Sequence, residues 1–398
     1  MKKIYYGKAV YDSKEINAVI NVLRNQSLSL IDGKNVKILE KTVSSIFGKK
    51  YGLMVNSGSS ANLLALASFN FKKGSEIITP NLTFSTTVAP IYQLGLIPHF
   101  IGVEKNKFVA DPSHIEKCIN KKTVALIIPN LLGNIADWKI INAIAKKHKL
   151  RVIEDSADTI GYTIKGSNAG KFSDITTNSF YASHIINGAG FGGMACFNNF
   201  KLYQRAKLLR GWGRSSATFN ESESIKKRFN VKISGIDYDG KYVFSELGYN
   251  FLPSEISAAF ALEQVKKLRN NIKIRNKNFE YLKNFFKNFK NYFKLPEQYK
   301  NIKTPWLAFP LVIKNNKLFN RKEMQIFFEK HKIQTRTIFT GNILKQPVMQ
   351  NKYFKKHPKC HIIANDVMKN GILLGCHQGM KKSELDYMCK TFLKFIEQ

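Results

Sequence analysis

Three short segments of this sequence carry small, hydroxyl-bearing or ionisable residues where predicted strands end. Residues 56–62 read Asn-Ser-Gly-Ser-Ser-Ala-Asn, between an apolar run and a predicted helix. Glu154 and Asp155 close a second apolar run. Residues 179–193 contain a strand end, His184 and a glycine-rich turn. Histidine moves protons near neutral pH, and glycine lets the backbone approach a ligand closely, so this third segment is suited to acid–base chemistry beside a bound group.

The first two segments each allow a simpler interpretation. Gly58 and Ser59 stand where backbone N–H groups at a helix N-terminus and serine hydroxyls can bind a phosphate. A capped helix start without a ligand explains the same residues equally well. A carboxylate at Asp155 can meet the protonated nitrogen of a pyridine ring and keep that ring electron-poor. By itself, however, Asp155 is more simply explained as a helix cap or a surface acid.

The elements that must position these residues alternate along the first part of the chain. Four apolar runs predict strands, and helical patterns follow three of them; the runs are 52–55, 76–79, 124–128 and 151–155, and the helices are 60–68, 86–94 and 138–148. Alternating strands and helices predict an α/β fold with a parallel sheet covered on both faces. Such sheets bind ligands at the carboxyl ends of their strands, so chemistry is expected just after each run.

A second region is predicted to begin near Leu252. It opens with one long amphipathic pattern over residues 255–289, followed by a strand at 306–313 and helices near 321–331 and 382–397. The sequence therefore predicts a large domain over residues 1–251 and a smaller α+β domain over residues 252–398. The stretch 285–293, rich in Asn, Lys and Phe, is expected to be a solvated helix end or a loop.

Composition narrows the class of protein. The 398 residues carry a formal net charge of +35, but lysines are spread along the whole chain, which favours a solvated basic surface over a nucleic-acid-binding strip. Attraction of an anionic substrate is a weaker consequence of the charge. No segment reaches the ~18–20 apolar residues of a membrane span, and no signal-peptide pattern stands at the start, so a cytoplasmic protein is expected. The five cysteines lack the spacing of metal ligands, and no metal site is expected.

The third segment also resembles a known family. Ser179-Phe-Tyr-Ala-Ser-His184, followed by the glycine-rich turn, is similar to the sugar aminotransferases of pyridoxal phosphate fold type I, the DegT family. In that family the pattern reads Ser-Phe-x-x-x-Lys, so His184 replaces the lysine. Further segments extend the resemblance over nearly the whole chain and place it in the histidine-containing dehydratase branch; they are residues 209–214, 246–250, 334–342 and 375–379.

The resemblance implies a fold and a set of cofactor contacts. The fold is that of aspartate aminotransferase, with a large domain built on a mixed, mostly parallel sheet and a smaller α+β domain. Phe84 would stack on the cofactor ring, Asp155 would contact its pyridine nitrogen, and Ser179 would bind its phosphate. Asp158 stands where aminotransferases usually carry Gln or His, and an acid there is typical of the dehydratase branch.

The resemblance also implies a homodimer in which two subunits build each site. Arg214 and Asn250 would reach the neighbour's cofactor phosphate, although without the family match they would be interpreted as a surface arginine and a turn asparagine. Arg336 and His377 would contact the substrate.

The activity implied is a 3-dehydratase acting on a nucleotide-linked 4-keto-6-deoxy sugar, with the GDP-mannose derivative as first candidate. A lysine would bond to the cofactor aldehyde; His184 cannot, so pyridoxamine phosphate stays available while the imidazole moves protons. Ammonia and a 4-keto-3,6-dideoxy sugar would be released, and glutamate would re-aminate the cofactor. Residues 215–220 lack the cysteines that hold an iron–sulfur cluster in related CDP-sugar enzymes, so no cluster is expected. An ordinary sugar aminotransferase and a non-catalytic cofactor-binding regulator remain alternatives.

Overall fold

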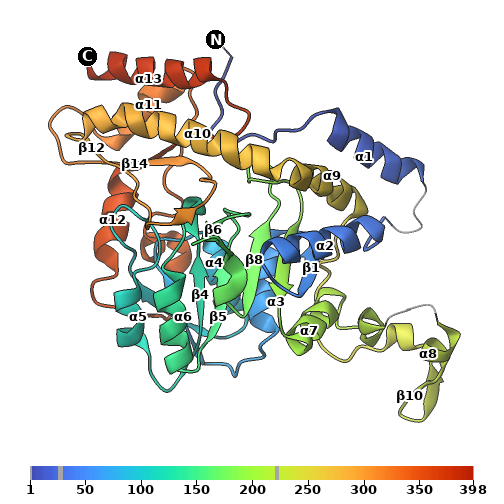
Figure 1. Ribbon diagram of the computed structural model, residues 1–398. Helices are drawn as coiled ribbons and strands as arrows, with labels where there is room; N and C mark the ends of the chain where they lie inside the picture. The colour runs from blue at the N-terminus through green and yellow to red at the C-terminus, as the bar shows by residue number, and fades with distance from the viewer. Residues whose placement is uncertain (1, 26–29, 220–223, 398) are drawn as a thin grey trace.

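The computed structural model describes residues 2–25, 30–219 and 224–397, and Figure 1 shows their arrangement. An eight-stranded sheet forms the centre of the larger part, in the order β1-β9-β8-β5-β4-β2-β3-β15. Its strands are β1 Tyr51–Val55, β2 Glu76–Pro80, β3 Ile97–Ile101, β4 Thr123–Pro129, β5 Arg151–Asp155, β8 Ile175–Ser179, β9 Gly193–Phe197 and β15 Lys355–Lys356. Only β9 pairs antiparallel with its neighbours, so the sheet is mixed and mostly parallel, as predicted.

Helices cover both faces of this sheet, so both faces are buried. Alternate residues along each strand point to opposite faces. On β4, Ala125 and Ile127 pack on one face with helices α3, α4 and α7. Leu126 and Ile128 pack on the other face with α2, α5, α6 and α9. The helices of the two layers are α2 Lys34–Ile46, α3 Gly58–Ala67, α4 Ser85–Gln93, α5 Pro112–Cys118, α6 Trp138–Lys147, α7 Phe200–Arg210 and α9 Glu255–Lys266. The helix α1, Ser13–Arg24, lies on α9.

The long pattern predicted over residues 255–289 forms two helices rather than one. Helix α9 ends at Lys266 and α10 spans Leu268–Phe286. Lys267 joins them, and its Nζ lies 2.6 Å from Glu15 on α1. Residues of α9 belong to the core under the large sheet, whereas the core residues of α10 from Phe279 onward belong to a separate cluster.

That separate cluster forms the smaller part of the molecule. A three-stranded antiparallel sheet of β12 Phe293–Lys294, β14 Phe309–Ile313 and β16 Gly371–Leu374 packs with α10, α11 Arg321–Lys330, α12 His361–Asn370 and α13 Lys382–Ile396. Ile4 pairs with Ile333, so the first residues of the chain pack here as well. A division at residue 251 remains a prediction. Helix α9 follows that residue but packs in the core of the large part, and Ile4 precedes it but packs in the core of the smaller part.

The expected helix end at residues 285–293 is present and its lysines and asparagines are exposed, but its phenylalanines are not solvated. The side chains of Phe286 and Phe293 are each 1% exposed, and Phe286 packs on Phe392 of α13 at 5.2 Å between ring centroids. The asparagines and lysines of this stretch suggested solvent, but its phenylalanines recur every three or four residues and form one face. They fill the core of the smaller part.

One segment stands apart from both cores. Residues 224–247, here called the arm, include α8 Ile225–Phe229 and the hairpin β10 Val231–Ile233 with β11 Ile236–Tyr238, and they project from the large part beyond α7 (Figure 1). The arm exposes apolar side chains, among them Ile225 at 77%, Ile236 at 67% and Leu247 at 98%. Among the described residues, no helix is both long enough and apolar enough to span a bilayer.

Candidate active site

A cavity of about 540 Å³ lies at the carboxyl ends of five strands of the large sheet. Its walls come from the segments that follow β1, β2, β4, β5 and β8, as expected for a ligand site in an open parallel sheet. Tyr6, Leu307 and Phe339 close it from the N-terminal segment and the smaller part. The volume is in the range of sites for small molecules and cofactors, ~300–1,000 Å³.

The segment after β1 gives one end of the cavity a set of hydrogen-bond donors. Ser57 caps α3, and its Oγ accepts a hydrogen bond from the Ser60 backbone N–H at 3.1 Å. Gly58 and Ser59 then present the first turn of the helix to the cavity, beside Ser179 at the end of β8. A Cβ atom at position 58 would lie 2.6 Å from Cβ of Ser179, so only glycine fits here. The structure thus brings Gly58, Ser59 and Ser179 together at a helix N-terminus suited to an anion.

Asp155 is a buried carboxylate on the cavity wall. Its Oδ2 accepts hydrogen bonds from Asn62 Nδ2 and Thr87 Oγ1, both at 2.8 Å, and its Oδ1 accepts one from the Ala157 N–H at 3.1 Å. Burial raises the pKa of Asp155, and these neutral donors oppose the rise. None of its partners among the described residues is a cation. A protonated ring nitrogen in the cavity would supply one.

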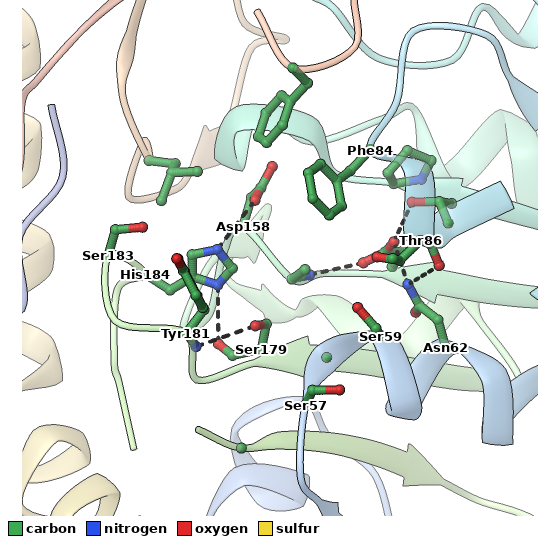
Figure 2. Close-up of a pocket in the computed structure, with 18 of the residues that line it drawn as sticks. Ser57, Ser59, Asn62, Phe84, Thr86, Asp158, Ser179, Tyr181, Ser183 and His184 are labelled. Carbon is green, nitrogen blue, oxygen red and sulfur yellow. Dashed lines mark hydrogen bonds and ion pairs between the residues drawn. The ribbon is translucent and has the colours of Figure 1, made fainter. Parts of the chain in front are cut away.

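His184, whose ring faces Asp158 in Figure 2, lines the same cavity. Its Nδ1 lies 3.3 Å from the Ser179 carbonyl oxygen, so Nδ1 carries the hydrogen and Nε2 is left as the basic atom. Nε2 lies 4.0 Å from Oδ1 of Asp158, and the His184 side chain is 15% exposed. Burial lowers the pKa of His184 to about 4, partly opposed by the Ser179 carbonyl. At neutral pH the imidazole is therefore uncharged and able to accept a proton.

Asp158 lines the same cavity as Asp155 and His184. Its Oδ2 accepts a hydrogen bond from the Leu132 N–H at 2.8 Å. Burial raises the pKa of Asp158 to about 7, and the charge of Asp155 adds to the rise. At neutral pH Asp158 is therefore divided between its acid and carboxylate forms, so it can donate or accept a hydrogen bond next to Nε2.

Known proteins share this fold. Residues 10–393 match the family described as the DegT/DnrJ/EryC1/StrS aminotransferase family. The chain belongs to this family. It is 33% identical to the lipopolysaccharide biosynthesis protein RfbH of Salmonella typhimurium, over 92% of this chain and 86% of that protein. It is 32% identical to the GDP-4-keto-6-deoxy-D-mannose 3-dehydratase of Escherichia coli O55:H7, over 96% of this chain and 97% of that one.

A solved structure extends the comparison to the cofactor. A GDP-4-keto-6-deoxymannose-3-dehydratase with a trapped PLP–glutamate geminal diamine superposes with a TM-score of 0.85, at 29% identity, covering 98% of this chain and 99% of that one. The expected fold and the expected cofactor, pyridoxal or pyridoxamine phosphate, are thereby confirmed. This DegT-family chain is a pyridoxal-phosphate-dependent, sugar-modifying enzyme.

The residues of the cavity fit that cofactor. The donors at Gly58 and Ser59 suit its phosphate, and buried Asp155 suits its ring nitrogen. Phe84, at the N-terminus of α4, is 50% exposed and borders the cavity, so one face of its ring is available for stacking. These roles remain proposals based on the geometry.

The other predicted residues lie apart from this cavity. The Arg214 guanidinium stacks over the Trp212 ring at 4.2 Å, and Asn250 pairs with Gly211 at the base of the arm. Neither lines the cavity of its own chain. Arg336 lines an adjoining cavity of about 480 Å³, which shares Tyr6, Phe84 and Phe339 with the first.

The contact between His377 and the substrate stays a prediction, and the side chain of His377 is held by backbone groups. Its side chain is 3% exposed and lies outside both cavities. Nε2 lies 3.2 Å from the Tyr5 carbonyl oxygen, and Nδ1 accepts a hydrogen bond from the Gly379 N–H at 3.2 Å. Both ring nitrogens are therefore occupied by backbone groups, and His377 holds the N-terminal segment against the smaller part.

Several residues of the site were not predicted from the sequence. Asn62 and Thr87 donate hydrogen bonds to the Asp155 carboxylate. Both lie inside predicted helices, where polar residues do not by themselves indicate a site. The spacing of Asn62 four residues after Gly58 places both on one face of α3, which was a usable indication. Tyr181 borders the cavity with its ring 5.8 Å from that of His184. The sequence around Tyr6 does not indicate that this residue belongs to the site, because only the packing of the two parts brings Tyr6 to the cavity.

The raised pKa of Asp158 predicts a pH-dependent stability. In the unfolded chain an aspartate titrates at ~3.9, so between that pH and about 7 the folded protein holds a proton that the unfolded chain has released. The contribution of Asp158 to stability is therefore lost as pH rises through about 7. Asp158→Asn removes this titration and keeps an acceptor for the Leu132 N–H.

We expect the Tm of Asp158→Asn, relative to the wild type, to increase between about pH 5 and about pH 8. Thermal melts of the cofactor-free proteins followed by circular dichroism measure it. The opposite effect of His184, whose lowered pKa removes stability as pH falls, is present in both proteins and cancels in the difference. A Tm difference that is constant across this range would contradict the assignment.

Proposed function

We propose that this enzyme is a pyridoxamine-phosphate-dependent 3-dehydratase of a nucleotide-linked 4-keto-6-deoxy sugar, with GDP-4-keto-6-deoxymannose as the first candidate. The observation that carries the proposal is His184: an uncharged imidazole whose Nε2 faces Asp158, at the position where family aminotransferases have a lysine. The E. coli relative and the solved structure, both dehydratases by name, support it.

The replacement of lysine by histidine has a chemical consequence for this site. A lysine at position 184 would bond to the cofactor aldehyde, whereas an imidazole leaves the amine form free for a keto group. When bound, the cofactor supplies that amine and a ring that withdraws electrons, so that loss of the C3 hydroxyl reduces the sugar, oxidises the amine to the aldehyde and releases ammonia. Nε2 of His184 takes up a proton and can return it to the departing hydroxyl. Asp155 holds the ring nitrogen protonated, and glutamate is the proposed amino donor, as the glutamate adduct of the solved structure supports.

The adjoining cavity offers a place for the rest of the substrate. It opens from the cofactor cavity past Tyr6 and Phe84, and Arg336 is the one Lys or Arg among the described residues that line either cavity. The Arg336 guanidinium also lies 5.9 Å from the Tyr6 ring centroid, which keeps it near the junction. We propose that it meets the diphosphate of the nucleotide sugar.

We also propose a homodimer with shared sites. The described residues that line the cofactor cavity include no lysine or arginine to pair with a phosphate. Arg214 and Asn250 lie at the base of the arm, and Nε of Arg214 is buried without a hydrogen-bond partner. The exposed apolar side chains of the arm suit burial against a second copy. Arg214 would then complete the neighbour's site.

Mixing two inactive variants tests this dimer. His184→Asn inactivates a subunit's own site, and Arg214→Ala inactivates the site of its neighbour. In a mixed dimer one site keeps both native residues, so random reassociation should restore about a quarter of wild-type activity. Each variant alone should stay below a few per cent, measured as ammonia released. No recovery in dimers shown by mass to be mixed would contradict the shared site.

The dehydratase proposal is tested with the purified protein, pyridoxal phosphate and glutamate. Absorbance should shift from the aldehyde to the amine form of the cofactor. Addition of GDP-4-keto-6-deoxymannose should then release ammonia. Amine formation without ammonia would favour the alternative, an ordinary sugar aminotransferase, or a different nucleotide. Failure of both steps would favour a non-catalytic cofactor-binding protein. The name of the Salmonella relative supports a role of the 3,6-dideoxy product in lipopolysaccharide O-antigen or capsule synthesis.

A further inference from the structure

Arg275, on α10, is a fully buried cation whose nearest partners are all uncharged. Its side chain is 0% exposed, and among the described residues no carboxylate lies within ion-pair distance of it. Nε donates to Oε1 of Gln378 at 2.7 Å, and Nη1 donates to the carbonyl oxygens of Trp306 and Leu307 at 3.2 and 3.1 Å. Burying a guanidinium costs several kcal/mol unless its donors are satisfied. This position therefore uses all three nitrogens to bind backbone and amide oxygens.

The third nitrogen reaches the loop that carries His184. Nη2 lies 3.5 Å from the Ser183 carbonyl oxygen and 3.4 Å from that of His184. Leu307, Ser183 and His184 all border the cofactor cavity. A single side chain from α10 thus joins two walls of that cavity through their backbone carbonyls.

The positive charge of Arg275 also acts on His184. It lowers the pKa of the imidazole further, after the larger effect of burial. Burial also lowers the pKa of Arg275 itself to about 10, so the guanidinium stays charged at neutral pH. His184 also faces Asp158 at 4.0 Å and the ring of Tyr181. Among the described residues, removal of Arg275 would leave the Ser183 and His184 carbonyl oxygens without a side-chain donor from α10.

We propose that Arg275 is a positioning residue for His184, holding the loop from the smaller part so that Nε2 is directed at the reacting atoms. This inference rests on the proposed function, in which His184 moves protons. Arg275 touches neither substrate nor cofactor, and it acts by restricting where the imidazole can lie.

The test compares Arg275→Lys with Asn278→Leu. Asn278 lies one turn further along α10, is 5% exposed, and donates to the carbonyl oxygens of Cys376 and His377, so it supports the same helix without touching the His184 loop. A lysine keeps the charge but cannot reach three segments at once. We expect Arg275→Lys to lower kcat for ammonia release by ~10–100-fold, with KM and cofactor affinity within about twofold of the wild type. Asn278→Leu should lower Tm and leave kcat nearly unchanged.

A second readout does not need activity. In cofactor-free protein labelled with ¹⁵N-histidine, the His184 signals of the wild type should show a hydrogen fixed on Nδ1, and Arg275→Lys should show both tautomers. If Arg275→Lys does not fold, Gln378→Met removes only the acceptor at Nε and serves in the same comparison. Equal kcat in the Arg275 and Asn278 variants, with unchanged His184 signals, would overturn the proposal. A wild type that releases no ammonia would overturn the proposed function instead, and the NMR comparison would still decide the role of Arg275.

Discussion

Replacement of His184 by asparagine should lower the rate of ammonia release by ~100- to 10,000-fold, the usual contribution of a positioned acid–base group. Asparagine keeps a similar size and can still donate to the Ser179 carbonyl, which lies 3.3 Å from Nδ1 in the native protein. It has no basic atom to replace Nε2. Cofactor binding, followed by absorbance, should change by less than about threefold, because the contacts to Asp155 and to the phosphate donors are untouched.

His184→Lys gives the matched comparison. A lysine here can bond to the cofactor aldehyde, and borohydride reduction followed by mass spectrometry of the peptide would find the cofactor on residue 184. Ammonia release should be lost as in the asparagine variant. If either variant kept more than about a tenth of wild-type activity, His184 would not be the proton carrier.

The second large effect concerns Asp155. Asp155→Asn keeps an oxygen and the size of the side chain but removes the negative charge that we propose faces the ring nitrogen. The ring would lose its proton and with it most of its ability to withdraw electrons, so we expect kcat to fall by at least ~100-fold. Steady-state ammonia release measures this, and the absorbance of the bound cofactor reports the protonation of the ring.

Glu154 provides the control for Asp155 on the same strand. Its side chain points to the opposite face of β5, where it accepts hydrogen bonds from Asn130, Ser156 and Ser173. Glu154→Gln is as conservative a change at an equally buried carboxyl, yet it should leave kcat within about threefold of the wild type. Equal losses in both variants would mean that Asp155 acts through stability rather than through the ring.

Much of this site could be predicted from the sequence because its main residues follow strands. The carboxyl ends of parallel strands share one edge of the sheet, so the segments after β1, β5 and β8 had to meet. Gly58, Asp155 and His184 therefore converge although they are far apart in the chain. The resemblance to the DegT family then gave these positions a cofactor, which local patterns alone left open.

What the sequence could not predict depends on how the two parts pack. Arg275 lies on the buried stripe of α10 with Phe279 and Leu282, whereas Arg269 lies on the exposed side. The helical spacing indicates that stripe, but it does not show that Arg275 meets the loop of His184. The surroundings of His377 could not be predicted for the same reason, since the Tyr5 carbonyl oxygen near its Nε2 is 372 residues away in the chain. The phenylalanines of residues 285–293 were likewise misjudged, because their partners lie on α13.

The structure of the sugar product, after turnover with glutamate in deuterated water, decides whether this histidine site removes the C3 oxygen of a keto sugar. We expect a product lighter by one oxygen atom, with the 4-keto group retained and deuterium at C3 in its NMR spectrum. A product that keeps the C3 hydroxyl and carries an amino group at C4 would rule out the dehydratase and identify an aminotransferase.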